Sequence, residues 1–367
     1  MELKQKLIPN IHIRWAEIHE LLMKKRGLGY FLSAMLVVVL AGAGVLTWMW
    51  LQPVPQETAI FPAAQKAPEP PKYFSPLTGA LVADDATTKR HVTAVMIENS
   101  PDARPQSGLK DAGIIYEAIA EGGITRFLAL YQESRPALIG PVRSVRPYYV
   151  EWAAAYDPSV AHIGGSARAL GMIRSGNYGV DIDQFFNPAG YWRANDRRAP
   201  HNVYTDFDKL DALSTAKGKT SSTFTPFDRK EDKKVDPPNA TQIHLPISSA
   251  WYNVDYQYDA ASNSYLRKVG GEAHIDREGG QLQPRTVVAL LVGMTREMED
   301  GYREQITTTG TGRGFVFQDG TVTEVTWQRD TDKSPLKLLD AKGAVVALNR
   351  GQTWITAMPS TKVPTWQ

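Results

Sequence analysis

DAGIIYEAIAEGGITRFLALY, residues Asp111–Tyr131, is the segment that decides the fold. It holds two apolar runs, Asp111–Ala120 and Thr125–Tyr131, on either side of the turn EGG. Short apolar runs that are bounded by glycine-rich turns are typical of buried strands. A third run of this kind, Val92–Ile97 (VTAVMI), precedes the turn-rich text ENSPDARPQSG. We therefore expect a buried sheet in the first folded region.

Strands and helices then alternate along the chain. Further strands are expected at Ala137–Val142 and Ser159–Ile163. The expected helices are Pro147–Tyr156, Ala167–Arg174 and Thr205–Ala216. Proline is tolerated in the first turn of a helix, and Thr205 and Asp208 have the spacing of a capping box. Alternating strands and helices predict a mixed sheet of the α/β type that is covered by helices.

The chain changes character after a Ser/Thr- and Lys/Asp-rich stretch that ends near Asn239. Apolar alternation and turn residues then predict mostly strands. The expected hairpins and the buried strand are Trp251–Tyr258 with Ser264–Val269, Thr286–Val292, Gly314–Phe317 with Thr321–Trp327, and Gly343–Leu348 with Gln352–Ala357. The Asp319-Gly320 pair is a strong hairpin signal. The fold class is therefore α+β: an α/β-type mixed sheet covered by helices, followed by a mostly β second domain.

An apolar stretch near the N-terminus, Tyr30–Leu51, predicts a transmembrane helix. It contains no charged residue and is long enough to cross about 30 Å of hydrocarbon. Lys24, Lys25 and Arg26 precede it, and no Lys or Arg follows until Lys66. The positive-inside rule then places the N-terminus in the cytoplasm and the C-terminal domains outside the cell membrane. A cleaved signal peptide is the alternative, but the stretch is long for one and lacks a small-x-small site after it.

These features divide the chain into six segments. They are a cytoplasmic segment (1–28), a transmembrane anchor (29–51), a proline-rich linker (52–72), an α/β domain (73–220), an interdomain loop (221–238) and a mostly β C-terminal domain (239–367). The linker contains six prolines among small and polar residues. Such a composition favours an extended, semi-rigid spacer.

The composition excludes several classes of site. A net charge of +2 gives no reason to expect nucleic-acid binding. Cysteine is absent, so disulfides, thiolate metal sites and a lipid-modified cysteine are excluded. The motifs G-x-S-x-G and H-E-x-x-H are absent too, which argues against a serine or a zinc hydrolase. We expect no cofactor and no metal site of defined spacing.

Two arginine-rich segments are the strongest functional signal. They are GPVRSVRPYYVEWA, Gly140–Ala153, and the run from Arg193 to Asn202. Arginine binds phosphate and carboxylate groups through two parallel hydrogen bonds. The predicted ligand-binding residues come from these segments and from a Gly-Gly-Ser turn: Arg143, Arg146, Gly164, Gly165, Ser166, Arg193, Arg197, Arg198, His201 and Asn202. Secondary candidates are Arg104, Arg126, Glu98, Glu117 and Glu121.

Each candidate also has a structural interpretation. Arg143 and Arg146 can pair with a carboxylate at the edge of the core, and the Gly-Gly-Ser turn can be a plain connection between a strand and a helix. His201 can act as a general base or as a hydrogen-bond donor to phosphate. The loop around it can equally be held by its own hydrogen bonds.

Several segments in combination resemble the YerB-like, or DUF3048, family of bacterial proteins. They are SPLTG (Ser75–Gly79), VMIENSPDARPQSGL (Val95–Leu109), EGGITRFLALY (Glu121–Tyr131), IGPVRSVRPYYV (Ile139–Val150), HIGGS (His162–Ser166), RRAPHNVYT (Arg197–Thr205), YLRKVGGEAHID (Tyr265–Asp276) and LNRGQTWI (Leu348–Ile355). The resemblance implies a two-domain protein that faces the cell envelope, and it implies no chemistry. Members of the family are often lipoproteins, whereas this chain has a predicted transmembrane helix.

The first domain also resembles the LytR–CpsA–Psr phosphotransferases, which move glycopolymers from a polyprenyl pyrophosphate lipid onto peptidoglycan. The similar text is TRFLALY, IGPVRSVRPYYVE and VAHIGGSARAL, in that order. The family motifs Arg/Lys-Ser-Asp-Thr and Ile-Pro-Arg-Asp correspond to Gly123–Arg126 and Pro141–Ser144 here, and both aspartates are missing. Their absence puts catalysis in doubt and affects ligand binding by Arg143 less.

Three hypotheses for function follow. The first is a membrane-anchored extracytoplasmic protein that binds an anionic cell-wall component, or regulates a partner in peptidoglycan synthesis, through the arginine-rich site. The second is a phosphotransferase that acts on a lipid-linked pyrophosphate, for which Mg²⁺ would be the cofactor. The third is a structural scaffold in which every arginine forms an ion pair. The expected partners are the membrane, through Tyr30–Leu51, and a cell-wall component or an envelope protein, with no nucleic acid.

Overall fold

A computed structural model describes residues 26–52, 72–296 and 301–367. The chain divides into two units, 1–69 and 70–367, which are described separately. In the first unit α2 (Arg26–Trp50) is a single helix. Its part from Tyr30 to Trp50 has a mean hydropathy of 2.2 and is long and apolar enough to cross a membrane. The predicted cytoplasmic segment and most of the proline-rich linker lie outside the described residues.

A ten-stranded mixed sheet forms the centre of the second unit. Its strands, in spatial order, are β22 (Lys337–Leu339), β21 (Thr321–Arg329), β20 (Gly310–Gln318), β17 (Thr286–Val292), β24 (Thr353–Pro359), β4 (Ile114–Glu121), β5 (Ile124–Tyr131), β3 (Thr93–Glu98), β6 (Ser159–His162) and β7 (Val180–Asp183). The segment Asp111–Tyr131 contains β4 and β5, an antiparallel pair at the middle of this sheet.

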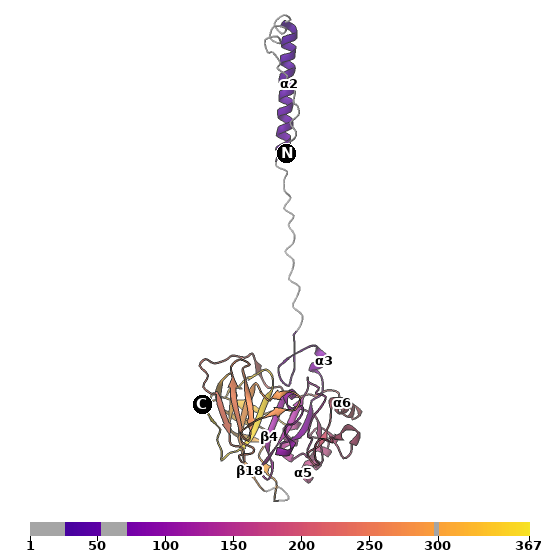
Figure 1. Ribbon diagram of the computed structural model, residues 1–367, viewed down its shortest axis with the longest axis vertical. Helices are drawn as coiled ribbons and strands as arrows, with labels where there is room; N and C mark the ends of the chain where they lie inside the picture. Colours follow the sequence, from indigo (N-terminus) through magenta and orange to yellow (C-terminus); the bar gives the residue numbers. More distant parts are fainter. Residues whose placement is uncertain (1–25, 53–71, 297–300) are drawn as a thin grey trace, which may run out of the picture. The chain divides into compact units, whose positions relative to one another are not determined.

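The sheet joins the two halves of the sequence. β24, from the end of the chain, lies parallel to β4 on one side and to β17 on the other. Figure 1 shows this arrangement, with the magenta strands of the first half continuing into the orange and yellow strands of the second. One sheet therefore contains strands from both halves of the sequence. The division into an α/β domain and a mostly β domain stays a prediction.

A second sheet has five antiparallel strands from the second half of the chain. They are β14 (Glu272–Ala273), β13 (Ser264–Val269), β12 (Val254–Asp259), β11 (Gln242–Leu245) and β25 (Thr365–Trp366), in spatial order. Five two-stranded pairs complete the described strands: β1 (Tyr73–Phe74) with β2 (Leu81–Val82), β8 (Trp192–Arg193) with β9 (Val203–Tyr204), β10 (Arg229–Lys230) with β23 (Leu348–Asn349), β15 (Ile275–Asp276) with β16 (Gly280–Gln281), and β18 (Met294–Thr295) with β19 (Gln305–Ile306).

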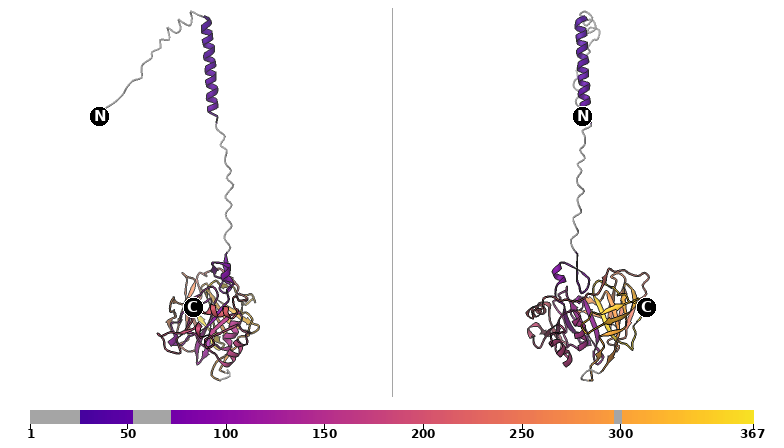
Figure 2. Two further views of the ribbon diagram at one scale, coloured as in Figure 1. Left: turned by 90° about the vertical axis from the view of Figure 1, so that its right-hand side faces the viewer. Right: turned by 180° about the vertical axis from the view of Figure 1, so that it is seen from behind.

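The helices lie beside the strands of the first half, as Figures 1 and 2 show. The α-helices of this unit are α3 (Asp85–Thr88), α4 (Pro147–Ala154), α5 (Ala167–Arg174) and α6 (Phe207–Ala216), and the 3₁₀ turns are Pro101–Ala103, Leu109–Asp111 and Pro188–Gly190. Residues of α4 and α5 share one core with one face of the large sheet, and residues of α6 share a second core with the other face. The fold class predicted from sequence, α+β with helices on a mixed sheet and a mostly β second half, is confirmed.

Period-two alternation explains how one sheet supports three cores. In β17, Val288 and Leu290 contribute to the core under α4, while Val287 and Ala289 contribute to a third core. That third core lies between β17 and β20 and the five-stranded sheet. Because successive side chains point to opposite faces of a strand, a continuously apolar strand needs a cover on both sides. The tyrosines of β12 and β13, Tyr256, Tyr258 and Tyr265, belong to this core.

Three local predictions are wrong. Ala137–Val142 forms isolated bridges to Ser107, Thr205 and Ile97 instead of a strand. Gly343–Leu348 does not pair with Gln352–Ala357, because β24 is already paired on both sides within the large sheet. The cap of α6 is Asp206, whose carboxylate accepts from the backbone N–H of Lys209 at 2.8 Å, and not the Thr205–Asp208 box.

Candidate functional site

A hollow of about 650 Å³ is lined by the loop after β3, the loop between β8 and β9 and the hairpin of β15 and β16. We call it the arginine hollow. Its lining residues are Asp102, Arg104, Pro105, Asp196, Arg197, Arg198, Ala199, His201 and Arg277. Four arginines and only two aspartates lie around this space, so it carries an excess of positive charge.

Arg193 and Asn202 close the loop that carries the arginines. β8 and β9 form an antiparallel pair at the two ends of this loop. Arg193 Nη1 donates to Asn202 Oδ1 at 2.8 Å, and Asn202 Nδ2 donates to the carbonyl of Ala194 at 3.1 Å. These contacts position the loop, and neither residue is among those that line the hollow.

Arg104 and Arg197 are held by backbone carbonyls. Arg104 donates to Asn99 Oδ1 at 3.0 Å and to the carbonyls of Asn99 and Trp251 at 3.1 Å. Arg197 donates to the carbonyl of Asp102 at 3.2 Å and to that of Pro105. Burial lowers the pKa of Arg104. Carbonyl acceptors fix both guanidinium groups without neutralising their charge.

Arg198 and Arg277 complete the positive lining. Within the described residues, the exposed guanidinium of Arg198 has no hydrogen bond or ion pair. Arg277 pairs with Asp196, and this hydrogen bond raises the pKa of Arg277. The sequence analysis did not select Arg277, although this residue directly follows YLRKVGGEAHID, one of the segments that carry the family resemblance. No spacing rule connects a residue of that hairpin with a loop so far away in the chain.

His201 is oriented by Glu98, as a base or acid would need to be. His201 Nδ1 lies 2.8 Å from Glu98 Oε1, and Ser100 Oγ donates to the same carboxylate oxygen at 2.8 Å. The carboxylate fixes the proton of the imidazole on Nδ1. Nε2 then lies 3.9 Å from Asp102 Oδ2, which also lines the hollow. Since Ser100 and Glu98 both approach Nδ1, the three residues do not form the relay of a serine hydrolase.

Arg143 forms an ion pair with the same carboxylate. Its Nε lies 3.0 Å from Glu98 Oε2, and its Nη2 donates to Glu98 Oε1 at 3.2 Å. Glu98 is almost completely buried, while a quarter of the Arg143 side chain is exposed. This geometry matches the structural role, in which Arg143 pairs with a carboxylate at the edge of the core. Ligand binding by Arg143 stays a prediction.

Arg146 and Arg126 share a second carboxylate, that of Glu121. Each arginine has a guanidinium nitrogen 2.7 Å from one oxygen of Glu121. Burial by itself would raise the pKa of Glu121, but the charges of Arg126 and Arg146 outweigh it and the pKa is lowered. Burial also lowers the pKa of Arg146. Both arginines are almost fully buried, so little of either is available to a ligand.

The Gly-Gly-Ser turn connects β6 with α5. Gly164 has a positive φ of +58°, which favours glycine, and its carbonyl accepts from the N–H of Val145 at 3.0 Å. Ser166 Oγ caps α5 by accepting from the N–H of Ala169 at 3.4 Å. The turn therefore lies against the segment VRSVR (142–146), as an anion site formed by both segments would require. However, Gly164, Gly165 and Ser166 do not line the arginine hollow.

Glu117 belongs to a network that is completely buried. Its carboxylate accepts from Arg267 Nη2 at 2.9 Å and from Trp354 Nε1 at 3.0 Å. Arg267 Nε donates to His274 Nδ1 at 2.9 Å, and His274 Nε2 lies 2.9 Å from Gln106 Oε1. Burial, together with the charge of Arg267, lowers the pKa of His274 well below its usual value, so the imidazole is neutral. We call these five residues the Arg267 network.

The three glutamates among the secondary candidates therefore have separate partners. Glu98 binds Arg143 and His201, Glu117 binds Arg267, and Glu121 binds Arg126 and Arg146. This arrangement gives no support to acid–base chemistry by two of these carboxylates.

Comparisons with known proteins identify the family. The N-terminal domain of "Protein of unknown function (DUF3048)" matches residues 77–221, and the C-terminal domain of the same family matches residues 243–355. The chain belongs to the DUF3048 family. "Putative lipoprotein YerB" of Bacillus subtilis (strain 168) is 33% identical over 294 residues, which cover 78% of this chain and 87% of that protein. The crystal structure of YerB from Bacillus subtilis matches with a TM-score of 0.72 and 30% identity, and covers 81% of this chain and 100% of that chain.

The resemblance to the DUF3048 family that was inferred from sequence is thus confirmed. Within the DUF3048 framework, the arginine hollow draws residues from both matched regions. Arg104, Arg197, Arg198 and His201 lie in the N-terminal match, and Arg277 lies in the C-terminal match. The site therefore depends on both parts of the family's sequence being folded together.

Proposed function

We propose that this DUF3048 protein is a cell-envelope protein that binds an anionic cell-wall component at the arginine hollow. The observation that carries the proposal is the convergence of four arginines, from three separate segments, around one space of about 650 Å³. A ligand with phosphate or carboxylate groups would supply the charge that the protein lacks there. Binding to such a component, or to a partner of peptidoglycan synthesis that carries one, is the function that this geometry supports best.

The partners of the arginines support an anionic ligand. Arg104 and Arg197 are fixed by neutral carbonyls, and Arg198 has no partner within the described residues. Among these four arginines, only Arg277 forms an ion pair with a carboxylate in the described part of the chain. Preorganised guanidinium groups with uncompensated charge bind phosphate and carboxylate strongly, because they lose little freedom on binding.

The proposed location rests on α2 and on the similar protein from Bacillus subtilis. α2 carries an apolar span that is long enough for a membrane, and the relative is named "Putative lipoprotein YerB". The basic residues before the span favour an N-terminus in the cytoplasm and a second unit outside. The proposed partners are accordingly the membrane, through Tyr30–Leu51, and a component of the cell wall, with no nucleic acid.

Group transfer is a second candidate, and one observation favours it. His201 lines the hollow, and Glu98 holds its Nδ1 so that Nε2 is free to accept or donate a proton. Under this candidate a lipid-linked pyrophosphate would be the substrate and Mg²⁺ the cofactor, as in the LytR–CpsA–Psr phosphotransferases. The missing aspartates of that family's motifs argue for binding without turnover.

The test measures binding of undecaprenyl pyrophosphate and of inorganic pyrophosphate to the full chain in detergent micelles, with and without Mg²⁺. Arg198→Ala removes an exposed guanidinium of the hollow, and Arg313→Ala removes an exposed arginine of β20 that pairs with Glu324. We expect binding that Arg198→Ala weakens about tenfold and Arg313→Ala leaves unchanged.

The other outcomes separate the hypotheses. Mg²⁺-dependent cleavage of the pyrophosphate, abolished by His201→Ala, would favour the enzyme, and transfer to an added acceptor would be required for a phosphotransferase. Equal binding by the wild type and by Arg198→Ala would place the ligand elsewhere. No binding of either probe, with the fold intact, would leave the structural scaffold as the account of these arginines.

A further inference from the structure

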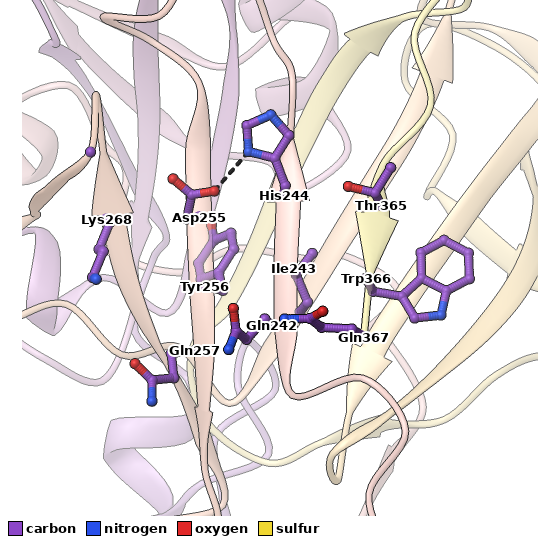
Figure 3. A pocket seen from close by; sticks show the side chains of 11 residues that line it. Gln242, Ile243, His244, Asp255, Tyr256, Gln257, Lys268, Thr365, Trp366 and Gln367 are labelled. Atoms are coloured by element: carbon purple, nitrogen blue, oxygen red, sulfur yellow. Dashed lines mark hydrogen bonds and ion pairs between the residues drawn. The ribbon is translucent and has the colours of Figure 1, made fainter.

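A second hollow, of about 620 Å³, lies on the five-stranded sheet and shares no residue with the arginine hollow. It is lined by β11, β12, β13 and β25, as Figure 3 shows. One face of this sheet is buried, since Ile243, Leu245 and Tyr256 belong to the core against the large sheet. The alternate residues face outward, and these supply the polar lining.

The outward residues form two rows across the strands. Gln242 lies opposite Gln257, and the backbone groups of Gln242 and Gln367 exchange two hydrogen bonds of 3.0 Å. Such a mutual exchange marks directly opposed residues of an antiparallel pair. Three carboxamides therefore lie side by side on three successive strands. None of the three carboxamides has a hydrogen bond within the described residues, and Figure 3 shows them on neighbouring strands.

The second row carries charges that are balanced within the protein. It runs from Thr365 through His244 and Asp255 to Lys268, with each residue opposite the next. His244 Nδ1 lies 2.7 Å from Asp255 Oδ1, the contact that is dashed in Figure 3. Lys268 supplies one positive charge and Asp255 one negative charge. This hollow therefore has no excess charge to attract an anion, in contrast to the arginine hollow.

We propose that this hollow binds a glycan chain that carries acetamido groups. A carboxamide has both a donor and an acceptor, and so does an acetamido group, so that the two can form paired hydrogen bonds. A row of three unpartnered carboxamides, beside a hydroxyl and a charge-balanced row, complements a neutral, hydroxyl-rich chain. Trp366 also contributes to the lining, while its ring packs on the core side of the sheet, 5.4 Å from the ring of Phe315, and two fifths of the residue are exposed.

An extended peptide fits this hollow less well. Peptides that join a sheet pair with the backbone groups of an edge strand. Here the polar lining consists of side chains on the face of the sheet, and the backbone groups of Gln242 are already bonded to Gln367. The edge strand β25 has only two residues, which is a short template for an added strand. The ligand must therefore be recognised through side-chain hydrogen bonds, which suits a saccharide.

Calorimetric titration of the full chain in detergent micelles tests the proposal. The probes are chitohexaose, which carries acetamido groups, cellohexaose, which lacks them, and an N-acetylated tripeptide. We expect chitohexaose to bind, and cellohexaose to bind at least about tenfold more weakly, because each lost hydrogen bond costs about fivefold in affinity. The double variant Gln242→Ala/Gln257→Ala should lose about tenfold or more of the affinity for chitohexaose.

Matched variants make the outcome decisive. Gln283→Ala removes an exposed glutamine of the same half that does not line the hollow, and Arg198→Ala alters the other hollow. Both should bind chitohexaose like the wild type, and His244→Ala should bind it less well. Three results would each overturn the proposal. They are no binding of chitohexaose, binding by the double variant and by His244→Ala that equals that of the wild type, and tighter binding of the tripeptide than of chitohexaose. The result is independent of pyrophosphate binding, so the failure of one site would not decide the other.

Discussion

The arginine hollow and the Arg267 network use the same side chain in opposite ways. In the network, Arg267 is completely buried, and its charge is balanced by the equally buried Glu117. In the hollow, Arg104 and Arg197 are bound to carbonyls and Arg198 is exposed without a partner in the described residues. Arginine by itself therefore indicates neither structure nor binding. The charge of its partner separates the two roles.

Intermediate cases lie between these extremes. Arg126 and Arg146 pair with Glu121, which is partly exposed, and Arg143 pairs with Glu98 and is itself partly exposed. If the comparison is right, replacing an arginine should lower the free energy of unfolding more when that arginine is more deeply buried and is bound to a carboxylate. Ligand affinity should follow the reverse order.

The largest effect is expected for Arg267→Ala. This substitution leaves the buried carboxylate of Glu117 without its cation and removes the guanidinium that lies 4.0 Å from the ring centre of Trp354. Breaking a buried ion pair by removing one partner costs about 3–5 kcal/mol. Urea unfolding of the full chain in micelles, followed by tryptophan fluorescence, measures the loss. A loss below about 1 kcal/mol would show that the network adds little to stability.

Sequence patterns predicted the fold well where strands were short, apolar and bounded by turns. β3, β4, β5 and β17 could be located for this reason, and Asp319 and Gly320 both have the positive φ that their hairpin turn requires. Patterns could not show that β24 lies between β17 and β4, since pairing between distant strands leaves no local signal. The single sheet through both halves follows from that pairing.

The candidate site was predictable in part. The Arg193–Asn202 run was selected because it is dense in arginine, and three of its predicted ligand-binding residues, Arg197, Arg198 and His201, line the hollow. Arg143 and Arg146 belong to the other arginine-rich segment, yet they are bound to carboxylates. Sequence holds no information about which glutamate reaches which arginine. For the same reason Arg277, which the β15–β16 hairpin brings from the second half of the chain, was not found.

The next largest effect is expected for Glu121→Gln. The neutral amide leaves two almost fully buried arginines without a counter-charge, so we expect a loss of about 2–3 kcal/mol at pH 7. Because the folded-state pKa of Glu121 is lowered, its stabilising contribution is complete above the unfolded pKa of about 4.3. It is lost as the pH falls from there through the lowered folded-state pKa. The variant should therefore lose less stability than the wild type between pH 5 and pH 3, as thermal unfolding at each pH would show.

Arg143→Ala should have a smaller effect. It removes two contacts with Glu98, but His201 and Ser100 still bind that carboxylate. We expect a loss of about 1–2 kcal/mol in the free energy of unfolding, together with unchanged affinity for pyrophosphate. Arg143→Lys, which keeps the charge but not the two-point contact, should recover part of the stability. A large loss of affinity with normal stability would instead move Arg143 to the group of ligand-binding arginines.

The smallest effect on stability, and the largest on binding, is expected for Arg198→Ala. An exposed side chain without a partner contributes within about 0.5 kcal/mol to folding. Its removal can even stabilise the free protein slightly, because it relieves repulsion among the four arginines of the hollow. The affinity for pyrophosphate should fall about tenfold, and the dependence of affinity on salt should become weaker, since one charge fewer is screened. Unfolding curves and titrations at two salt concentrations measure both quantities on one preparation. A destabilisation by Arg198→Ala as large as that by Arg143→Ala would contradict the comparison. A carboxylate partner would then not be what distinguishes structural arginines from ligand-binding ones.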